Sequence, residues 1–300
     1  MVHETIAATN AVVTLDVALP EVFWGWYVTM NMWAKSIGTG LVFMLFLLLR
    51  RNPEEMKSLR TSAMILSFVM MNIFLLFTLA DLHQPLRMWH IFFYPHLTSA
   101  ITIGAWMATV FVGLESLMIV VMLLKKDEAL YDKLLFWTTL LAVPVTLYTA
   151  AIMAEATARE LWQMPTEAAQ MILAATLSGS AAIILLGGNK LSDDTKNFFA
   201  TILGLSALMA FIIYMSEYIF GAMKAEEVAA ILHYVKGDGA YALMFWIGQW
   251  VAYILPMLLI SLYRVSGSSA VLNLAAILAI AGLWLVKHVW LVIPQLLPLS

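Results

Sequence analysis

Cysteine is absent from this chain of 300 residues, and charged residues are scarce. Without thiolates the chain cannot ligate an iron–sulfur cluster or a thiolate zinc site, and it cannot form a disulfide. Charged residues make up 12% of the sequence and hydrophobic residues 63%, whereas soluble globular domains average about 25% and about 45–50%. A net charge of -3 without a basic run argues against a nucleic-acid partner. The composition therefore predicts an integral membrane protein.

Histidines are missing from the places where a membrane-bound haem would need them. A b-type haem in a respiratory anchor subunit is held by two histidines from facing helices, but only His288 lies inside an apolar stretch. The remaining histidines, which belong to loops or a tail, are His3, His83, His90, His96 and His233. We therefore expect no haem. If the chain handles electrons, their carrier should be a quinone.

Eight apolar stretches are long enough to cross about 30 Å of hydrocarbon, which takes roughly 20 residues. They cover about 24–49, 62–80, 100–124, 134–153, 168–187, 198–223, 241–263 and 271–293. Each should be helical, because backbone groups in lipid must bond within their own segment. The expected fold is all-α and polytopic, one domain over 1–300. It would have two four-helix bundles, about 20–153 and about 168–295.

The distribution of Lys and Arg predicts the orientation. The loops after the first, third, fifth and seventh stretches contain Arg50, Arg51, Lys57, Arg60, Lys125, Lys126, Lys133, Lys190, Lys196 and Arg264. The opposite side contains only Arg87, Arg159, Lys224 and Lys236. Positive loops stay in the cytoplasm, so both termini should face outward from the cytoplasmic membrane. The longest outer connection, 81–99, should lie on the periplasmic face.

Polar residues within the stretches are candidates for function, because they face the bundle interior or a wet cavity. At a rise of 1.5 Å per residue, Asn31 lies roughly 10 Å and Tyr148 roughly 8 Å below the outer surface. These two side chains could therefore meet. Asn31 could instead only bond a neighbouring helix, and Tyr148 could be a packing aromatic with a satisfied hydroxyl.

Four charged residues also lie within the stretches, and they could form two pairs. Glu217 and Lys287 both lie roughly 9 Å below the outer surface, and a structural ion pair is favoured over a proton site. Lys35, one turn below Asn31, and Glu115 could act equally as structural glue or as a proton relay.

The outer connection contains the most specific motif. It reads Asp81-Leu82-His83-Gln84-Pro85-Leu86-Arg87-Met88-Trp89-His90, followed by Pro95, Thr98-Ser99, Gly104 and Trp106. This resembles the D-L-G-x-P-x-R-x-W … P-x-x-T-S … G-x-W signature of the NrfD / polysulfide reductase membrane-subunit (PsrC-like) family. Further similarities are Phe23-Trp24-Gly25-Trp26, Gly38, Gly40, Tyr148-Thr149, Glu217, Phe245-Trp246-x-Gly248, Pro256 and Pro294-Gln295. The resemblance covers nearly the whole chain.

The resemblance implies a haem-free subunit that binds menaquinone or ubiquinone in its first four-helix bundle, near the outer face. It implies partners as well: an iron–sulfur subunit docked on the outer face, near 89–95, and a molybdopterin catalytic subunit beyond it. The family's quinone contacts fall on Val28, Asn31 and Tyr148, of which only the tyrosine is unchanged. Asn31 replaces a histidine, so it can donate a hydrogen bond but cannot carry a proton. Lys287 stands where the family usually has arginine.

Protons released from a quinol would need a route out. Asp81, Arg87, His83 and His90 could form a wet rim that relays them, because histidines titrate near neutrality and carboxylates accept protons. Asp81 and Arg87 could equally pair to brace the loop. Lys35 with Glu115 could extend a path toward the cytoplasm and make turnover electrogenic.

Other classes of protein remain open on the sequence alone. A secondary transporter or ion-conducting protein also places charges in spans, although the broken helices and paired repeats of many transporters are not recognisable here. A passive anchor without quinone is a third reading. The sequence leaves open which quinone is bound, which way the electrons flow and which substrate the catalytic partner uses.

Overall fold

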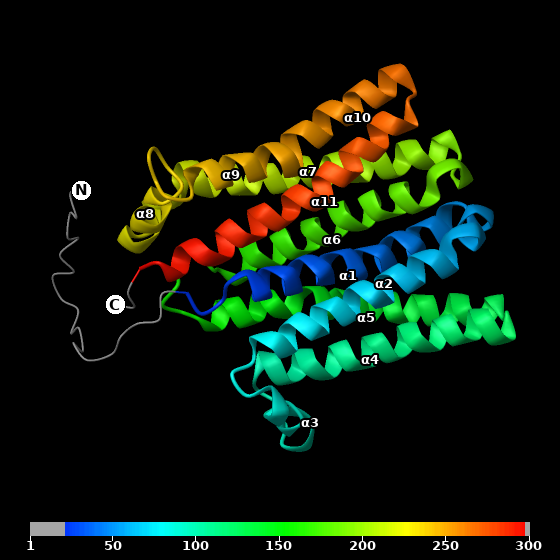
Figure 1. Ribbon diagram of the computed structural model, residues 1–300, viewed down its shortest axis with the longest axis horizontal. Helices are drawn as coiled ribbons and strands as arrows, with labels where there is room; N and C mark the ends of the chain where they lie inside the picture. The colour runs from blue at the N-terminus through cyan, green and yellow to red at the C-terminus, as the bar shows by residue number, and fades with distance from the viewer. Residues whose placement is uncertain (1–21, 298–300) are drawn as a thin grey trace.

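The computed structural model describes residues 22–297, and within them eight helices are long and apolar enough to cross a membrane (Figure 1). These spans are Trp26–Arg51, Pro53–Asp81, Ala100–Lys125, Glu128–Glu155, Met164–Lys190, Asp193–Met223, Ala242–Ser266 and Ser269–Gln295. The described part of the chain contains no strand. The prediction of an all-α polytopic membrane protein with eight spans is confirmed.

The spans are built from single helices or from helices continued by a short tighter or wider segment. The long helices are α1 (Trp26–Arg51), α2 (Pro53–Asp81), α4 (Ala100–Val120), α5 (Glu128–Glu155), α6 (Met164–Gly187), α7 (Asp193–Phe220) and α11 (Ser269–Val292). The seventh span joins α9 (Ala242–Gln249), the π-helical η5 (Trp250–Ile254) and α10 (Leu255–Ser266). The shorter elements are η1 (Pro85–Arg87), α3 (His90–Phe93), η2 (Val121–Lys125), η3 (Gly188–Lys190), η4 (Gly221–Met223), α8 (Glu226–His233) and η6 (Ile293–Gln295).

Several helices begin where a polar side chain satisfies a free backbone N–H group. The side chain of Asn52 accepts from the amide of Glu55 at the start of α2, and Asp127 accepts from Leu130 at 2.9 Å at the start of α5. Such caps stabilise a helix by about 1 kcal/mol each. The tight turns that separate these antiparallel spans are therefore encoded locally.

The helix α2 begins at Pro53, well before the apolar stretch predicted at 62. Its first turns are charged, and they make ion pairs instead of contacting hydrocarbon. Arg60 contacts Glu128 of α5 at 2.8 Å. A second pair, Arg51 with Asp194 at 2.7 Å, joins α1 to α7. Hydropathy alone misses such turns because they lie outside the hydrocarbon.

The helices α1 and α6 form the centre of the bundle. Within their most apolar stretches 72% and 67% of the residues are buried, against 33–39% in the other six spans. The two helices touch backbone to backbone at Gly40 and Gly179: a methyl group at residue 179 would lie 2.3 Å from the carbonyl of Gly40. Glycines allow this close approach, which maximises packing where lipid gives no hydrophobic drive. This crossing joins the two halves of the chain, whose division into two bundles stays a prediction.

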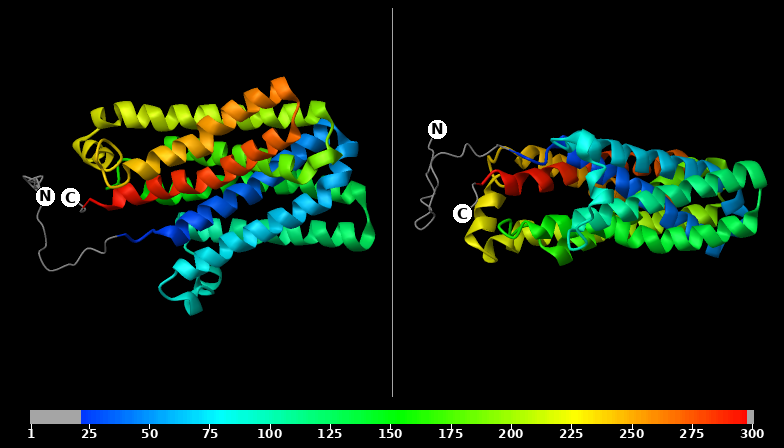
Figure 2. Two further views of the ribbon diagram at one scale, coloured as in Figure 1. Left: turned by 45° about the horizontal axis from the view of Figure 1, so that its top comes forward. Right: turned by 90° about the horizontal axis from the view of Figure 1, so that it is seen from below.

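One end of the bundle carries both the start of α1 and the end of α11, together with α3 and α8 (Figures 1 and 2). Gln295 ties the two helix ends together. Its side chain accepts from the amides of Phe23 and Trp24 at 3.1 and 2.9 Å, and it donates to the carbonyls of Trp24 and Leu291 at 3.0 and 2.8 Å. The direction of this end, outward or inward, stays a prediction.

Candidate functional site

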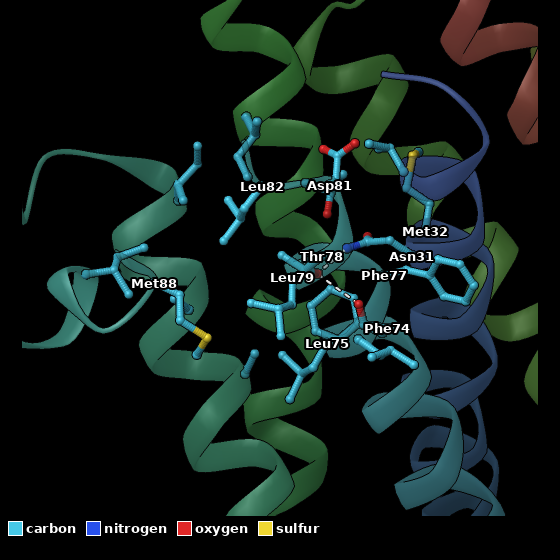
Figure 3. A pocket seen from close by; sticks show the side chains of 18 of the residues that line it. Asn31, Met32, Phe74, Leu75, Phe77, Thr78, Leu79, Asp81, Leu82 and Met88 are labelled. Carbon is cyan, nitrogen blue, oxygen red and sulfur yellow. Dashed lines mark hydrogen bonds between the residues drawn. The ribbon is translucent and has the colours of Figure 1, made fainter. Parts of the chain in front are cut away.

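A cavity of about 870 Å³ opens at the end of the bundle that carries α3. Its walls come from α1, α2, α4 and α5 and from the connection that follows α2 (Figure 3). Most of the walls are apolar, and Leu75 and Leu79 of α2 point into the space between α2 and α4 (Figure 3). The cavity therefore lies in the part of the chain where the resemblance places a ligand.

Asn31 forms part of the α1 wall and is 91% buried. Its side-chain nitrogen donates to the hydroxyl of Thr78 on α2, and that hydroxyl donates to the carbonyl of Phe74 at 2.8 Å (Figure 3). This short chain of bonds fixes the orientation of the Asn31 amide at the cavity wall. The bond from Asn31 to a neighbouring helix is therefore present, and it leaves the amide at the cavity wall.

Tyr148 lies on the α5 wall of the same cavity. Its ring packs against the backbone of Gly104 on α4, where a methyl group would fall 2.3 Å from the ring, and it meets Phe74 edge-on at a centroid distance of 6.4 Å. The glycine of the G-x-W motif thus makes room for this tyrosine. Asn31 and Tyr148 line one cavity from different helices, as the prediction that they could meet requires.

Lys35 lies beside this site and is 1% exposed. Its ammonium donates to the hydroxyl of Thr149 and to the carbonyl of Thr146 at 3.3 Å, and it lies 4.3 Å from the centroid of the Tyr148 ring. The expected pair with Glu115 was wrong: Glu115 accepts a hydrogen bond from Ser67, and no ion pair joins it to Lys35 in the part of the chain described.

The rim residues are only partly gathered around the cavity. Asp81, His83 and Arg87 line it, as does Val28, but His90 does not. The His90 ring packs against Trp89 instead, with their centroids 4.0 Å apart. No ion pair between Asp81 and Arg87 occurs in residues 22–297, so the bracing alternative is not seen.

The expected pair of Glu217 with Lys287 was also wrong. Glu217 forms its ion pair with Lys224, which directly follows the end of the same span at Met223. Lys287 faces α6, where its ammonium lies 3.6 Å from the sulfur of Met171. Residues of similar predicted depth can therefore contact different neighbours, because contact also depends on which way each side chain faces.

Three residues of this region were not among the predicted site residues, although Thr149 belongs to the quoted Tyr148-Thr149 similarity. Thr78 and Thr149 line the cavity and hold Asn31 and Lys35, yet threonines on an apolar helix give little signal. Glu167 is 1% exposed and accepts a bond from the indole of Trp290 at 3.1 Å. It stands one residue before the apolar stretch that begins at 168, so hydropathy leaves it outside the predicted spans. Its spacing from Gln170, i to i+3 on one helix face, is the signal that could have found it.

The fold and the cavity define a polytopic α-helical membrane protein with a deep apolar site between its first helices. Residues 17–298 match the family described as Polysulphide reductase, NrfD. The match spans nearly the whole chain, and the chain therefore belongs to this family. No curated protein matches it. Within residues 22–297, no three histidine, aspartate or glutamate side chains gather as a metal site would require.

Proposed function

We propose that this chain is the haem-free membrane subunit of a respiratory oxidoreductase complex. Its cavity binds a quinone or quinol, and the electrons pass to or from a partner iron–sulfur subunit. Membership of the NrfD family supports this proposal. The single observation that carries it is the cavity that brings Asn31 and Tyr148 together behind apolar walls.

The size and chemistry of the cavity fit such a substrate. Pockets for small molecules span about 300–1,000 Å³, and this one has about 870 Å³. A quinone consists of a flat ring with two carbonyl oxygens and a long apolar tail. The mouth of the cavity includes Leu76 of α2, which is 60% exposed, and Ile101 of α4, which is 51% exposed. Both face the surface that lipid covers, so the tail can leave the site without contacting water.

The polar groups of the site have separate roles. The Asn31 amide and the Tyr148 hydroxyl are hydrogen-bond donors, which suit the ring carbonyl oxygens. Neither is a good proton carrier, because an amide does not titrate and a phenol holds its proton tightly. Asp81 and His83 on the rim carry a carboxyl and an imidazole group, which are common proton donors and acceptors in proteins. We therefore assign binding to Asn31 and Tyr148, and proton exchange with water to the rim.

The electrons need an acceptor outside this chain, because the sequence contains no cysteine for a cluster. The connection beside the cavity mouth exposes Trp89, Phe93 and Tyr94, and aromatic side chains are enriched at protein interfaces. We place the iron–sulfur subunit here, on the periplasmic side of the cytoplasmic membrane, with a molybdopterin subunit beyond it.

Purification of the chain with its bound partners tests this proposal against its alternatives. Co-purified iron–sulfur and molybdenum subunits with bound quinone are expected. A complex without quinone would identify a passive anchor, and an isolated chain that conducts ions or transports a solute would identify a transporter.

The variant Tyr148→Phe tests the site itself. It removes one hydroxyl and keeps the ring that packs on Gly104, so the complex should assemble normally and oxidise quinol more slowly. Unchanged kinetics would contradict the assignment of Tyr148.

A further inference from the structure

A second cavity of about 10 Å³ lies behind the wall of the large one, between α6, α7 and α11. Glu167, Gln170 and Lys287 line it, together with Tyr214, Trp290 and Met171. Met32, Met153 and Leu291 line both cavities. A single layer of three apolar side chains therefore separates a buried charged cluster from the proposed quinone site.

The hydrogen bonds of this cluster are incomplete. Glu167 accepts one bond, from Trp290. The hydrogen-bond partner of Lys287 is the sulfur of Met171, which is a weak acceptor. The side-chain nitrogen of Gln170, which is 94% buried, has no partner. In residues 22–297 no ion pair of 4.0 Å or less joins Glu167 to Lys287, although they face the same small space.

The cavity has the size and the lining of a site for one water molecule. Such a site needs about 10–15 Å³ and two to four polar partners, and Glu167, Gln170 and Lys287 supply three. A buried carboxylate and ammonium that do not touch are costly. A water between them would bond both charges and the free amide of Gln170, which lowers this cost.

We propose that Glu167 and Lys287, bridged by one water, form a proton-exchange site for the neighbouring cavity. This inference rests on the proposed quinone function. Oxidation of a quinol gives up two electrons, which pass to the iron–sulfur partner, and two protons. The Glu167 carboxylate takes up one of them and becomes a carboxylic acid, and the rim residues Asp81 and His83 take the other. The Lys287 ammonium stabilises the carboxylate until that proton arrives. Quinone reduction reverses both transfers.

The layer between the cavities fits this role. Met32 and Met153 are flexible side chains that rearrange without loss of packing, so a transient water contact between the cavities costs little. The layer also shields the Glu167 cluster from bulk water between transfers. An exposed carboxylate would exchange its proton with bulk water and would not depend on the ligand.

A purely structural pair makes a different prediction, which separates the two roles. Removal of one partner of a buried pair leaves the other charge uncompensated and destabilises the protein, whereas replacement of both partners restores stability. If Glu167 and Lys287 only stabilise the fold, the double variant Glu167→Gln/Lys287→Met will restore activity as well. If Glu167 holds a proton, the double variant will be stable but slow.

The experiment uses the whole complex in membranes with quinol as substrate. Its variants are Glu167→Gln, the double variant Glu167→Gln/Lys287→Met, and Glu217→Gln as control, because Glu217 is a buried carboxyl that lines neither cavity. Bound quinone, kcat, KM and thermal stability are measured for each. Infrared difference spectra between the reduced and oxidised complex detect the carboxylic acid directly.

We expect both Glu167 variants to lack a carboxylic-acid band that the wild type and Glu217→Gln show. We also expect them to lower kcat by about 100-fold, the low end of the range for proton-transfer groups, with KM and bound quinone unchanged. An unchanged band and rate in Glu167→Gln, or full activity in the double variant, would overturn the proton-exchange site alone. A wild-type complex that neither binds nor oxidises quinol would overturn the proposed function and this inference with it.

Discussion

The ring of Tyr148 packs against Gly104, so closely that a methyl group at residue 104 would fall 2.3 Å from the ring. This contact joins α5 to α4 at the wall of the cavity, and it gives a motif glycine a steric role. Because the hydroxyl position depends on where the ring rests, substitutions at Gly104 can probe the site without touching a polar group.

The variant Gly104→Ala should displace the Tyr148 ring and slow quinol oxidation, while the complex still assembles. Overpacking of this kind costs about 1–3 kcal/mol, so a lowered melting temperature should accompany the lost rate. The matched control is Gly113→Ala on the same helix, where a methyl group meets nothing within 4 Å. Equal rates in the two variants would refute the steric role.

The crossing of α1 and α6 should be intolerant of any side chain. In Gly179→Ala the new methyl group would lie 2.3 Å from backbone atoms of Gly40, and backbone cannot move aside as a flexible side chain can. We expect a loss of at least about 1–3 kcal/mol, the usual range for overpacked sites, read as a lower melting temperature in detergent. Gly204→Ala on α7 is the control, since its methyl group would be 3.6 Å from the nearest side-chain atom. A melting temperature like that of the control would show that the helices can separate at no cost.

Variants of Lys35 and Glu115 test whether turnover moves charge across the membrane. Lys35 bonds to α5 and Glu115 to α2, so each can hold a proton independently of the other. We expect Lys35→Met and Glu115→Gln to reduce the membrane potential and the proton release per turnover. Lys35→Met should leave stability unchanged or raised, because it removes a buried cation that forms no ion pair within residues 22–297. Unchanged potential and proton release in both variants would rule out a path through these residues.

Gln295 is expected to fix the position of the segment that leads into the N-terminus of α1. Gln295→Leu keeps the bulk of the side chain but removes four hydrogen bonds to Phe23, Trp24 and Leu291. Trp24 lines the cavity, so the variant should retain less quinone. It should also unfold at a lower temperature, because buried groups left without a hydrogen bond lower the free energy of unfolding by about 1–3 kcal/mol. Gln163→Leu is a suitable control, because Gln163 is exposed and its side chain caps no helix. Quinone content equal to that of the control would contradict this role.

The sequence by itself determined the eight spans and the family. The thickness of the bilayer sets the length of an apolar run, and lipid permits only helices there, so hydropathy counts them reliably. The depth of a residue along a helix can also be estimated from the sequence, because the rise per residue is constant. This is why Asn31 and Tyr148 were expected at one level, and the structure places both on the walls of one cavity.

Only the tertiary structure decided which residues face one another. Glu217 and Lys287 were expected at one depth, yet Glu217 pairs with Lys224 while Lys287 faces the cavity of Glu167. Depth is one coordinate, and contact also requires the rotation of each helix about its axis. In a soluble helix the apolar stripe reveals that rotation, but a helix that is apolar on all sides carries no such stripe. The rotation of such a helix is set by its packing against other helices, as where Gly40 meets Gly179. This packing exists only in the folded bundle.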